Sequence, residues 1–294
     1  MKTIDLFRDR TVFSFEVFPP RKSAPLDSVF ATLDELQGLT PDYISVTYSA
    51  SGKANKESTL AIAAKIKNDF AVESVAHLTC LHQTKTEILA LLDQFRANNI
   101  ENILALLGDP IEGVEPVHDF EHASDLAAFI KSHGDFNVLG ACYPEGHLQA
   151  KTLADDIQNL KIKVDSGVSH LITQLFFENG PFYAFRDRAA AAGIHVPIQA
   201  GIMPVMSRRQ AERVVAMSGV QLPRKFLVML DRFADHPEAL LDAGIAFAVE
   251  QIVDLLAHGV DGIHLYTMNN ARVAHRINEA VRSLVATGSW CQTP

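Results

Sequence analysis

Residues 74–108 read SVAHLTCLHQTKTEILALLDQFRANNIENILALLG, and this stretch contains the unit from which the whole fold is built. Its two ends, 74–80 and 102–108, are short apolar runs of the length typical of buried strands. Between them, apolar residues recur at i, i+3, i+4 and i+7, which predicts one amphipathic helix. These residues are Ile88, Leu91, Leu92 and Phe95. A strand, a helix and a second strand predict a right-handed βαβ unit with parallel strands.

The same order of elements recurs along the whole chain. Six further apolar runs lie at 12–18, 43–49, 137–143, 170–177, 195–202 and 262–267. Two further helical stripes consist of Leu153, Ile157, Leu160 and Val164, and of Leu241, Ile245, Ala248, Ile252 and Leu255. Eight such units predict an α/β fold of the closed (β/α)8 TIM-barrel type, as a single domain spanning residues 1–294. An open doubly wound sheet is the second choice, because no GxGxxG motif follows any of the runs.

Composition limits the classes of partner and the compartment. The chain has 294 residues, of which 26 are Lys or Arg and 35 are Asp or Glu, and its net charge of −9 argues against nucleic-acid and anionic-membrane partners. The N-terminus has no apolar core of a signal peptide, and acidic residues interrupt the apolar stretch 240–260. Three widely spaced cysteines without a CxxC motif argue against a disulfide framework. A cytoplasmic protein is therefore expected.

Glu16 is the first candidate catalytic residue. In the run 12–18, Phe13, Phe15 and Val17 share one face of a strand, and Ser14 and Glu16 share the other. The bulky face suits the surrounding helices, so Glu16 is expected to point into the mouth of the barrel. A carboxylate there could serve as a general acid or could pair with a cation, and the pattern alone leaves both interpretations open.

Two further groups of polar residues follow strands. Asp109 closes a buried run in the sequence Gly-Asp-Pro, where it could act chemically or shape the turn. Tyr143-Pro144-Glu145-Gly146-His147 closes another run, and the helix after it carries Asp156, Asn159 and Lys163 on one face. Such a stripe is usually a solvated surface, but it could also hold a phosphate or a polyol. Glu16, His77, Asp109 and His147 could also converge on a metal ion, although no HxH or HExxH motif occurs.

Together, seven motifs in this order make the chain resemble the bacterial methylenetetrahydrofolate reductase family from end to end. They are Ser14-Phe15-Glu16-Val17-Phe18-Pro19-Pro20, Ser45-Val46-Thr47-Tyr48, His77-Leu78-Thr79-Cys80, Gly108-Asp109, Tyr143-Pro144-Glu145-Gly146-His147, Lys161-Ile162-Lys163-Val164-Asp165-Ser166-Gly167 and Thr173-Gln174-Leu175-Phe176-Phe177. The resemblance implies a (β/α)8 barrel with non-covalent FAD at the carboxyl ends of the strands. It also implies ping-pong hydride transfer from NADH or NADPH through the flavin to 5,10-methylenetetrahydrofolate, giving 5-methyltetrahydrofolate for one-carbon metabolism and methionine biosynthesis.

The resemblance also assigns roles to residues. Glu16 corresponds to the acid that protonates the folate nitrogen, and Asp109 to a carboxylate beside the flavin and the pterin. Contacts with FAD or the nicotinamide carry over to Thr47, Tyr48, Ala50, His77, Leu107, Gly108, Asp109, Ala123, Tyr143, His147, Asp156, Asn159 and Lys163. Substrate contacts carry over to Asp109, Gln174, Gln210, Tyr266 and Asn270. The polar helical stripe then becomes a wall of the flavin groove.

Three positions depart from the family pattern. Leu107 and Asn270 stand where the family has an arginine, and Val214 stands where it has an aromatic residue; Arg272 could replace the second arginine. We expect NADH as the donor, because no arginine cluster suggests a 2′-phosphate site, and we expect a homo-oligomer. Because the chain ends at Pro294, we also expect no inhibition by adenosylmethionine. A metal-dependent barrel hydrolase and a non-catalytic protein that binds folate or flavin are the alternatives.

Overall fold

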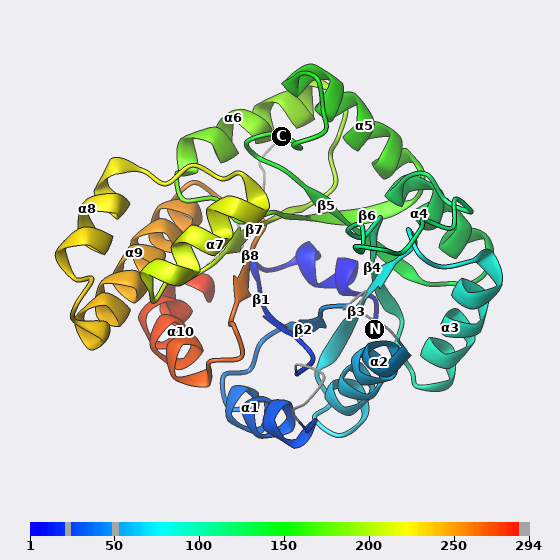
Figure 1. The fold of residues 1–294 in the computed structure, drawn as a ribbon, viewed down its shortest axis with the longest axis horizontal. Coiled ribbons are helices and arrows are strands. Elements are labelled where there is room, and N and C mark those ends of the chain that lie inside the picture. Colours follow the sequence, from blue (N-terminus) through cyan, green and yellow to red (C-terminus); the bar gives the residue numbers. More distant parts are fainter. Residues whose placement is uncertain (21–24, 49–52, 288–294) are drawn as a thin grey trace.

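The protein is a closed barrel of eight parallel strands in a computed structural model that describes residues 1–20, 25–48 and 53–287. The strands are paired in sequence order, and β8 closes the circle on β1 (Figure 1). This closure confirms the predicted (β/α)8 class and rules out the open sheet. The strands are β1 Val12–Val17, β2 Tyr43–Val46, β3 Glu73–Thr79, β4 Asn102–Leu106, β5 Asn137–Cys142, β6 Val168–Thr173, β7 Ile198–Ile202 and β8 Gly262–Tyr266.

Helices surround the barrel. They are α1 Asp27–Gln37, α2 Lys53–Asn68, α3 Lys85–Ala97, α4 Ala123–Ser132, α5 Leu153–Asp165, α6 Asn179–Ala191, α7 Arg208–Ser218, α8 Arg224–Arg232, α9 Pro237–Ala257 and α10 Ala271–Val285. The three helical stripes predicted from the sequence lie on α3, α5 and α9. The stripe on α3 is buried along its whole length. On α5, by contrast, Leu153 is 46% exposed. This residue was expected in the core and lies outside it.

The two faces of strand β1 point toward different parts of the molecule. On β1, Phe13, Phe15 and Val17 belong to the large core between the strands and the helices. Ser14 points the other way, into the barrel, where its hydroxyl contacts the imidazole of His264 on β8. Side chains alternate along β1, so Ser14 and Glu16 lie on the face that points toward the barrel axis, as the sequence pattern predicts.

A short 3-10 helix, η1 Thr3–Arg8, closes the amino end of the barrel. Figure 1 shows this N-terminal segment lying across the middle of the barrel. Leu6 packs there against inward side chains such as Tyr43 and Leu104. The backbone N–H of Thr3 donates to Asn102 Oδ1 at 2.8 Å. Sequence reasoning missed this plug, because six residues are too short for an apolar period to show.

His170 on β6 is a buried imidazole at this end of the barrel. Its ring contacts Phe7, and its Nε2 has no hydrogen-bond partner among the described residues. Burial lowers the pKa of His170 to about 3, and the nearby His264 adds to that effect. The imidazole is therefore neutral in the folded protein at any pH near neutrality.

The buried His170 should make the protein less stable in mild acid. Below pH 6.5 the unfolded chain takes up a proton at this residue, which the folded chain does not accept until about pH 3. Between pH 8 and pH 5 this costs about 2 kcal/mol of unfolding free energy. Urea denaturation of the parent and of His170→Gln at both pH values measures the effect. A stability difference between the two proteins that is the same at pH 8 and pH 5 would contradict it.

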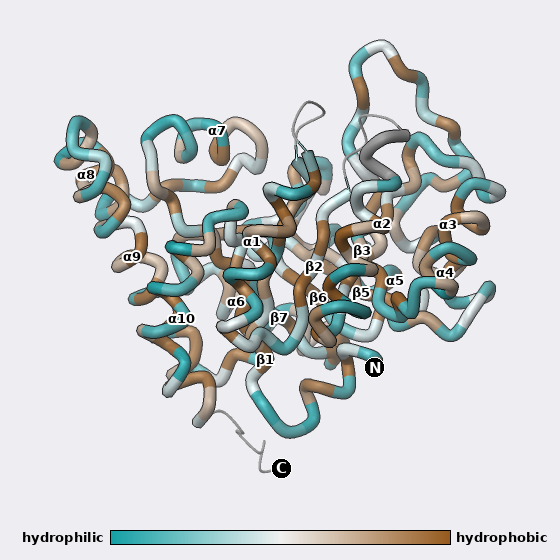
Figure 2. Tube along the Cα trace, turned by 90° about the horizontal axis from the view of Figure 1, so that it is seen from below, coloured by the Kyte–Doolittle hydropathy of each residue, from teal (hydrophilic) through white to brown (hydrophobic). Residues whose placement is uncertain are grey.

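Two additional helices, α7 and α8, stand between β7 and α9. Figure 2 shows them at one end of the molecule, with the N-terminus toward the other. They enclose a second apolar cluster that includes Leu175, Phe177 and Phe226. The first two of these were expected to belong to a strand over 170–177, but β6 ends at Thr173 and they pack under α7 and α8 instead.

Candidate active site

The candidate site lies at the carboxyl ends of the strands, where barrel enzymes carry their chemistry. Glu16, near the end of β1, is its centre, and its side chain is 15% exposed. Its Oε2 lies 3.5 Å from His77 Nε2 on β3 and 3.5 Å from His264 Nε2 on β8. The carboxylate therefore stands between two imidazoles that come from opposite sides of β1.

His264 anchors this arrangement and was not predicted. Its Nδ1 lies 2.7 Å from Ser14 Oγ, and its Nε2 lies 3.3 Å from Ser45 Oγ. Gln199 Nε2 donates to the same Ser14 hydroxyl at 3.1 Å. The signal was present in the sequence, because His264 and Tyr266 alternate along 262–267 and must share the inner face.

His77 is a neutral imidazole. Burial lowers its pKa to about 4 against the opposing attraction of the Glu16 carboxylate. Its Nε2 has no hydrogen-bond partner within the described part of the chain, since the 3.5 Å approach to Glu16 is a contact only. A buried nitrogen without a partner beside a carboxylate is well placed for a polar atom of a ligand.

The loop after β4 carries Asp109 outward from the barrel. Gly108 has a φ of +93°, and a Cβ at this position would lie 2.9 Å from the Cβ of Thr79. Only glycine fits this turn, which leaves Asp109 exposed beside the barrel mouth. Leu107 is half-buried and packs against the large core.

The loop after β5 and helix α5 form one wall. The rings of Tyr143 and His147 meet edge to face at 4.5 Å, and burial with the nearby Cys142, Asp109 and Asp156 raises the pKa of Tyr143 to about 12. Burial lowers the pKa of Lys163, whose Nζ donates to the Ala141 carbonyl at 2.8 Å.

The remaining residues expected to contact the cofactor surround the same end of the barrel. The hydroxyl of Tyr48 is buried and lies close to the Gln83 side chain. Thr47 follows β2 and is half-buried, Ala123 is the first residue of α4, and Asn159 is exposed on α5. Ala50 lies outside the described residues.

The residues expected to contact the substrate differ in how many of their polar atoms already form hydrogen bonds within the protein. Gln174 Oε1 accepts from the backbone N–H of Leu175 at 2.9 Å. Tyr266 donates to the Thr173 carbonyl at 2.8 Å. Gln210 uses both ends of its amide locally, on Met206 N and Pro204 O.

The helix α10 begins at one of the departing positions. Asn270 caps it by accepting from Val273 N at 3.2 Å. Arg272, which was considered as a replacement for the missing arginine, pairs with Glu238 at 3.0 Å on the outside. Val214 is buried in the second apolar cluster.

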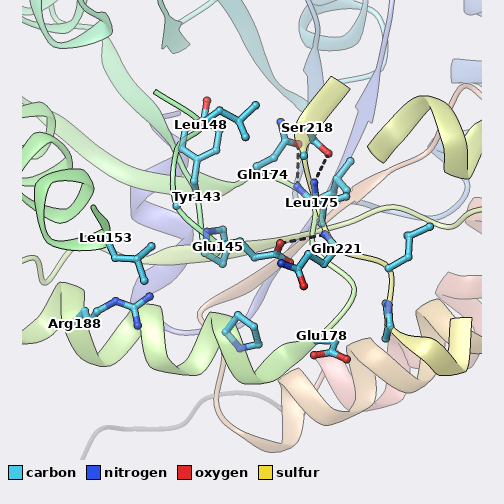
Figure 3. Close-up of a pocket in the computed structure, with 17 residues that line it drawn as sticks. Tyr143, Glu145, Leu148, Leu153, Gln174, Leu175, Glu178, Arg188, Ser218 and Gln221 are labelled. Atoms are coloured by element: carbon cyan, nitrogen blue, oxygen red, sulfur yellow. Dashed lines mark hydrogen bonds between the residues drawn. The ribbon is translucent and has the colours of Figure 1, made fainter. Parts of the chain in front are cut away.

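A pocket of about 420 Å³ opens beside Gln174. It lies between the loop after β5, the start of α6 and the segment 218–223 that connects α7 to α8 (Figure 3). Glu145 crosses it and accepts from Gln221 N at 3.2 Å. Burial and the nearby Glu178 raise the pKa of Glu145, which this hydrogen bond opposes.

The arrangement does not favour a metal hydrolase. Within residues 1–20, 25–48 and 53–287, no three His, Cys, Asp or Glu side chains are placed to hold a metal ion. His147 packs edge to face on Tyr143, whereas His77 lies 3.5 Å from Glu16. No helix in the described part of the chain is long and apolar enough to cross a membrane.

Comparison with known proteins agrees with the sequence motifs. The family model described as methylenetetrahydrofolate reductase matches residues 2–282. The 5,10-methylenetetrahydrofolate reductases of Pectobacterium carotovorum and Escherichia coli are each 36% identical, over 90% of this chain and 88% of theirs. The Arabidopsis thaliana methylenetetrahydrofolate reductase (NADH) 1 is 35% identical over 92% of this chain and 49% of its own length.

Among solved structures, an uncharacterized protein from Clostridium thermocellum has the same fold. The TM-score is 0.64 at 14% identity, and the match covers 95% of this chain and 97% of that protein. That protein binds two copies of 5-methyl-5,6,7,8-tetrahydrofolic acid. The likeness at this identity concerns the barrel alone.

Proposed function

The chain belongs to the methylenetetrahydrofolate reductase family, and on that premise we propose that it reduces 5,10-methylenetetrahydrofolate to 5-methyltetrahydrofolate, with NADH as the hydride donor and FAD as the carrier. The observation that carries the proposal is the Glu16 carboxylate, held at the mouth of the barrel between His77 and His264. The reductases from Pectobacterium and Escherichia supply the reaction by likeness, and the Arabidopsis relative, which is named for NADH, favours that donor.

The residues present fit a bound flavin nucleotide. The buried His77 Nε2 has no hydrogen-bond partner among the described residues and lies beside the Glu16 carboxylate, which suits a polar atom of a bound ligand. The turn at Gly108 leaves no room for a Cβ beside Thr79, and Lys163 on α5 offers a buried cation for a phosphate. FAD bound there supplies the hydride transfer, while the protein orients the reactants and sets the charge around them. The other residues proposed to contact the flavin nucleotide or the nicotinamide are Thr47, Ala50, Leu107, Ala123, Tyr143, His147, Asp156 and Asn159.

Glu16 is proposed as the acid of the second half-reaction. Its carboxyl group gives a proton to the folate nitrogen as the five-membered ring of the substrate opens. His264, fixed by Ser14 and Ser45, holds Glu16 in place and connects it to the interior of the barrel. Asp109, Gln174 and Tyr266 complete the folate site, and we propose that Gln210 and Asn270 contribute through the loops that they brace.

The purified protein should be yellow and should show both half-reactions. Its flavin absorbance should bleach on adding NADH without oxygen and return on adding methylenetetrahydrofolate. A colourless protein that fails to take up added FAD would refute the proposal. Flavin uptake without any turnover would instead favour a non-catalytic binding protein, the alternative that Leu107, Val214 and Asn270 suggested. We further propose that the chain acts as one catalytic domain, in the cytoplasm, and as a homo-oligomer.

A further inference from the structure

A second pocket, of about 480 Å³, opens at the end of the barrel opposite the candidate active site. It is formed by the segment that precedes β1, the segment that precedes β2 and the end of α10. Because Glu16 lies near the carboxyl end of β1, the segment before this strand belongs to the other face of the barrel. The proposed reaction therefore leaves this pocket without a role.

Asn278 on α10 lines the pocket with a buried side-chain amide. The residue is only 8% exposed, and its amide forms no hydrogen bond within residues 1–20, 25–48 and 53–287. Buried amides in proteins are nearly always hydrogen-bonded to protein, water or ligand. The amide of Asn278 has two N–H donors and an acceptor oxygen, so it can bind a polar group of a molecule in the pocket.

Arg282 lies one helical turn further along α10 and lines the same pocket. Its guanidinium has no ion-pair partner among the residues that the structure describes, whereas Arg276 on the same helix pairs with Asp242 at 2.6 Å. Side chains four residues apart are neighbours on a helix, so the guanidinium and the Asn278 amide lie together. Guanidinium groups bind carboxylates through two parallel hydrogen bonds. The end of α10 therefore suits a carboxylate.

The segments before β1 and β2 contribute the opposite charge. Arg10 donates to Asp9 Oδ1 at 3.2 Å and to Asp42 Oδ1 at 3.4 Å, so two carboxylates share one guanidinium. Burial raises the pKa of Asp42, against the hydrogen bond from Phe13 N and the attraction of Arg10, and the negative charge of Asp9 raises it further. A cationic group of a ligand beside Asp9 balances this excess of negative charge.

The rest of the pocket wall is partly apolar. Phe13 and Leu39 are buried and Val285 is half-buried, and all three line the pocket. Such a wall favours an apolar group on the ligand, because covering it removes apolar surface from water. A ligand that fits the whole pocket therefore carries a carboxylate, an ammonium group and an apolar side chain.

We propose that this pocket binds a free α-amino acid with an apolar side chain. Its carboxylate pairs with Arg282 and accepts a hydrogen bond from Asn278, its ammonium group lies beside Asp9, and its side chain packs on Phe13 and Leu39. The volume of about 480 Å³ lies in the range of small-molecule sites. Because the pocket and Glu16 lie on opposite faces of the barrel, this binding goes beyond the proposed function and does not depend on it.

Calorimetric titration of the purified protein with L-leucine tests the site directly. We expect saturable binding of one leucine per chain, with a dissociation constant below about 1 mM. Three analogues that each lack one group should bind roughly 10-fold more weakly. They are 4-methylpentanoate without the ammonium group, leucinamide without the carboxylate and glycine without the apolar side chain. Neither NADH nor methylenetetrahydrofolate should compete with leucine.

Substitutions assign the contacts to residues. Arg282→Gln should weaken leucine binding roughly 10-fold, and Asn278→Leu should weaken it roughly 3-fold. Asp9→Asn should weaken the binding of leucine but leave that of 4-methylpentanoate unchanged, which a general loss of structure would not do. Arg276→Gln removes an arginine of the same helix that does not line the pocket, and this control should bind leucine as the parent does.

Three results would overturn the inference. They are no binding at about 10 mM leucine, roughly ten times the expected constant, equal affinity for leucine and its analogues, and an affinity that Arg282→Gln leaves unchanged. A variant that ends at Thr287 should also bind leucine like the parent. Binding confined to this shortened variant would mean that the chain itself occupies the pocket, which also contradicts the inference. A protein that binds leucine as expected but does not reduce methylenetetrahydrofolate would overturn the proposed function alone.

Discussion

In the Glu16→Gln variant, NADH is expected to reduce the flavin at nearly the parent rate, while folate reduction falls about 1000-fold. The two half-reactions separate because only the second one needs a proton at the folate nitrogen, and a positioned general acid contributes roughly 10²- to 10⁴-fold. Glutamine keeps the shape of the side chain and its approach to His77 and His264, so the loss concerns the proton and leaves the packing intact.

Stopped-flow spectroscopy measures the two half-reactions of Glu16→Gln separately, through the bleaching and the return of the flavin absorbance. The matched control is Glu279→Gln, which removes the same charge from an exposed position on α10. Equal loss in both half-reactions would mean that Glu16 holds the flavin or the barrel and would exclude its role as the acid. Parent activity in both steps would place the acid elsewhere.

The barrel could be predicted because its repeating unit is visible in the sequence. Each strand is a separate apolar run, and helices such as α3 carry one continuous stripe. The additions to the barrel leave no such signal. The plug η1 is six residues long, and α7 and α8 replace what looked like a simple crossover with a second apolar cluster. Leu153 shows why apolar spacing alone does not establish burial. It continues the apolar stripe of α5, but it is exposed and lines a pocket.

The candidate site was predicted in part for similar reasons. Alternation on β1 places Glu16 on the inner face, whereas the long-range contact with His264 depends on the pairing of β1 with β8. Gln210 and Asn270 show the opposite problem. The side chains of both residues form hydrogen bonds with the backbone at helix starts and adjoining loops. These contacts are visible only in the structure. A residue type that fits a ligand equally fits a helix cap.

The Asp109→Asn variant should bind the folate roughly 10- to 100-fold more weakly and should have a flavin that is easier to reduce. A hydrogen bond to a charged group contributes about 1.5–3 kcal/mol, which gives the expected loss of affinity. The same carboxylate opposes the addition of electrons to a flavin nearby. Removing the charge should therefore raise the flavin potential, by about 30 mV for each 1.4 kcal/mol in a two-electron couple.

Glu112→Gln separates a local effect of Asp109 from a change in overall charge. Glu112 is exposed and lies three residues further along the same loop, so its substitution removes one charge from nearly the same region. Redox titration against a dye and folate titration of the oxidised enzyme give the two readouts for both variants. If Asp109 acts at the junction of the flavin and the pterin, only Asp109→Asn changes the potential and the affinity together. If both variants changed the flavin potential and the folate affinity by the same amounts, Asp109 would act only through the overall negative charge of the loop. If Asp109→Asn left both quantities unchanged, Asp109 would not belong to the site.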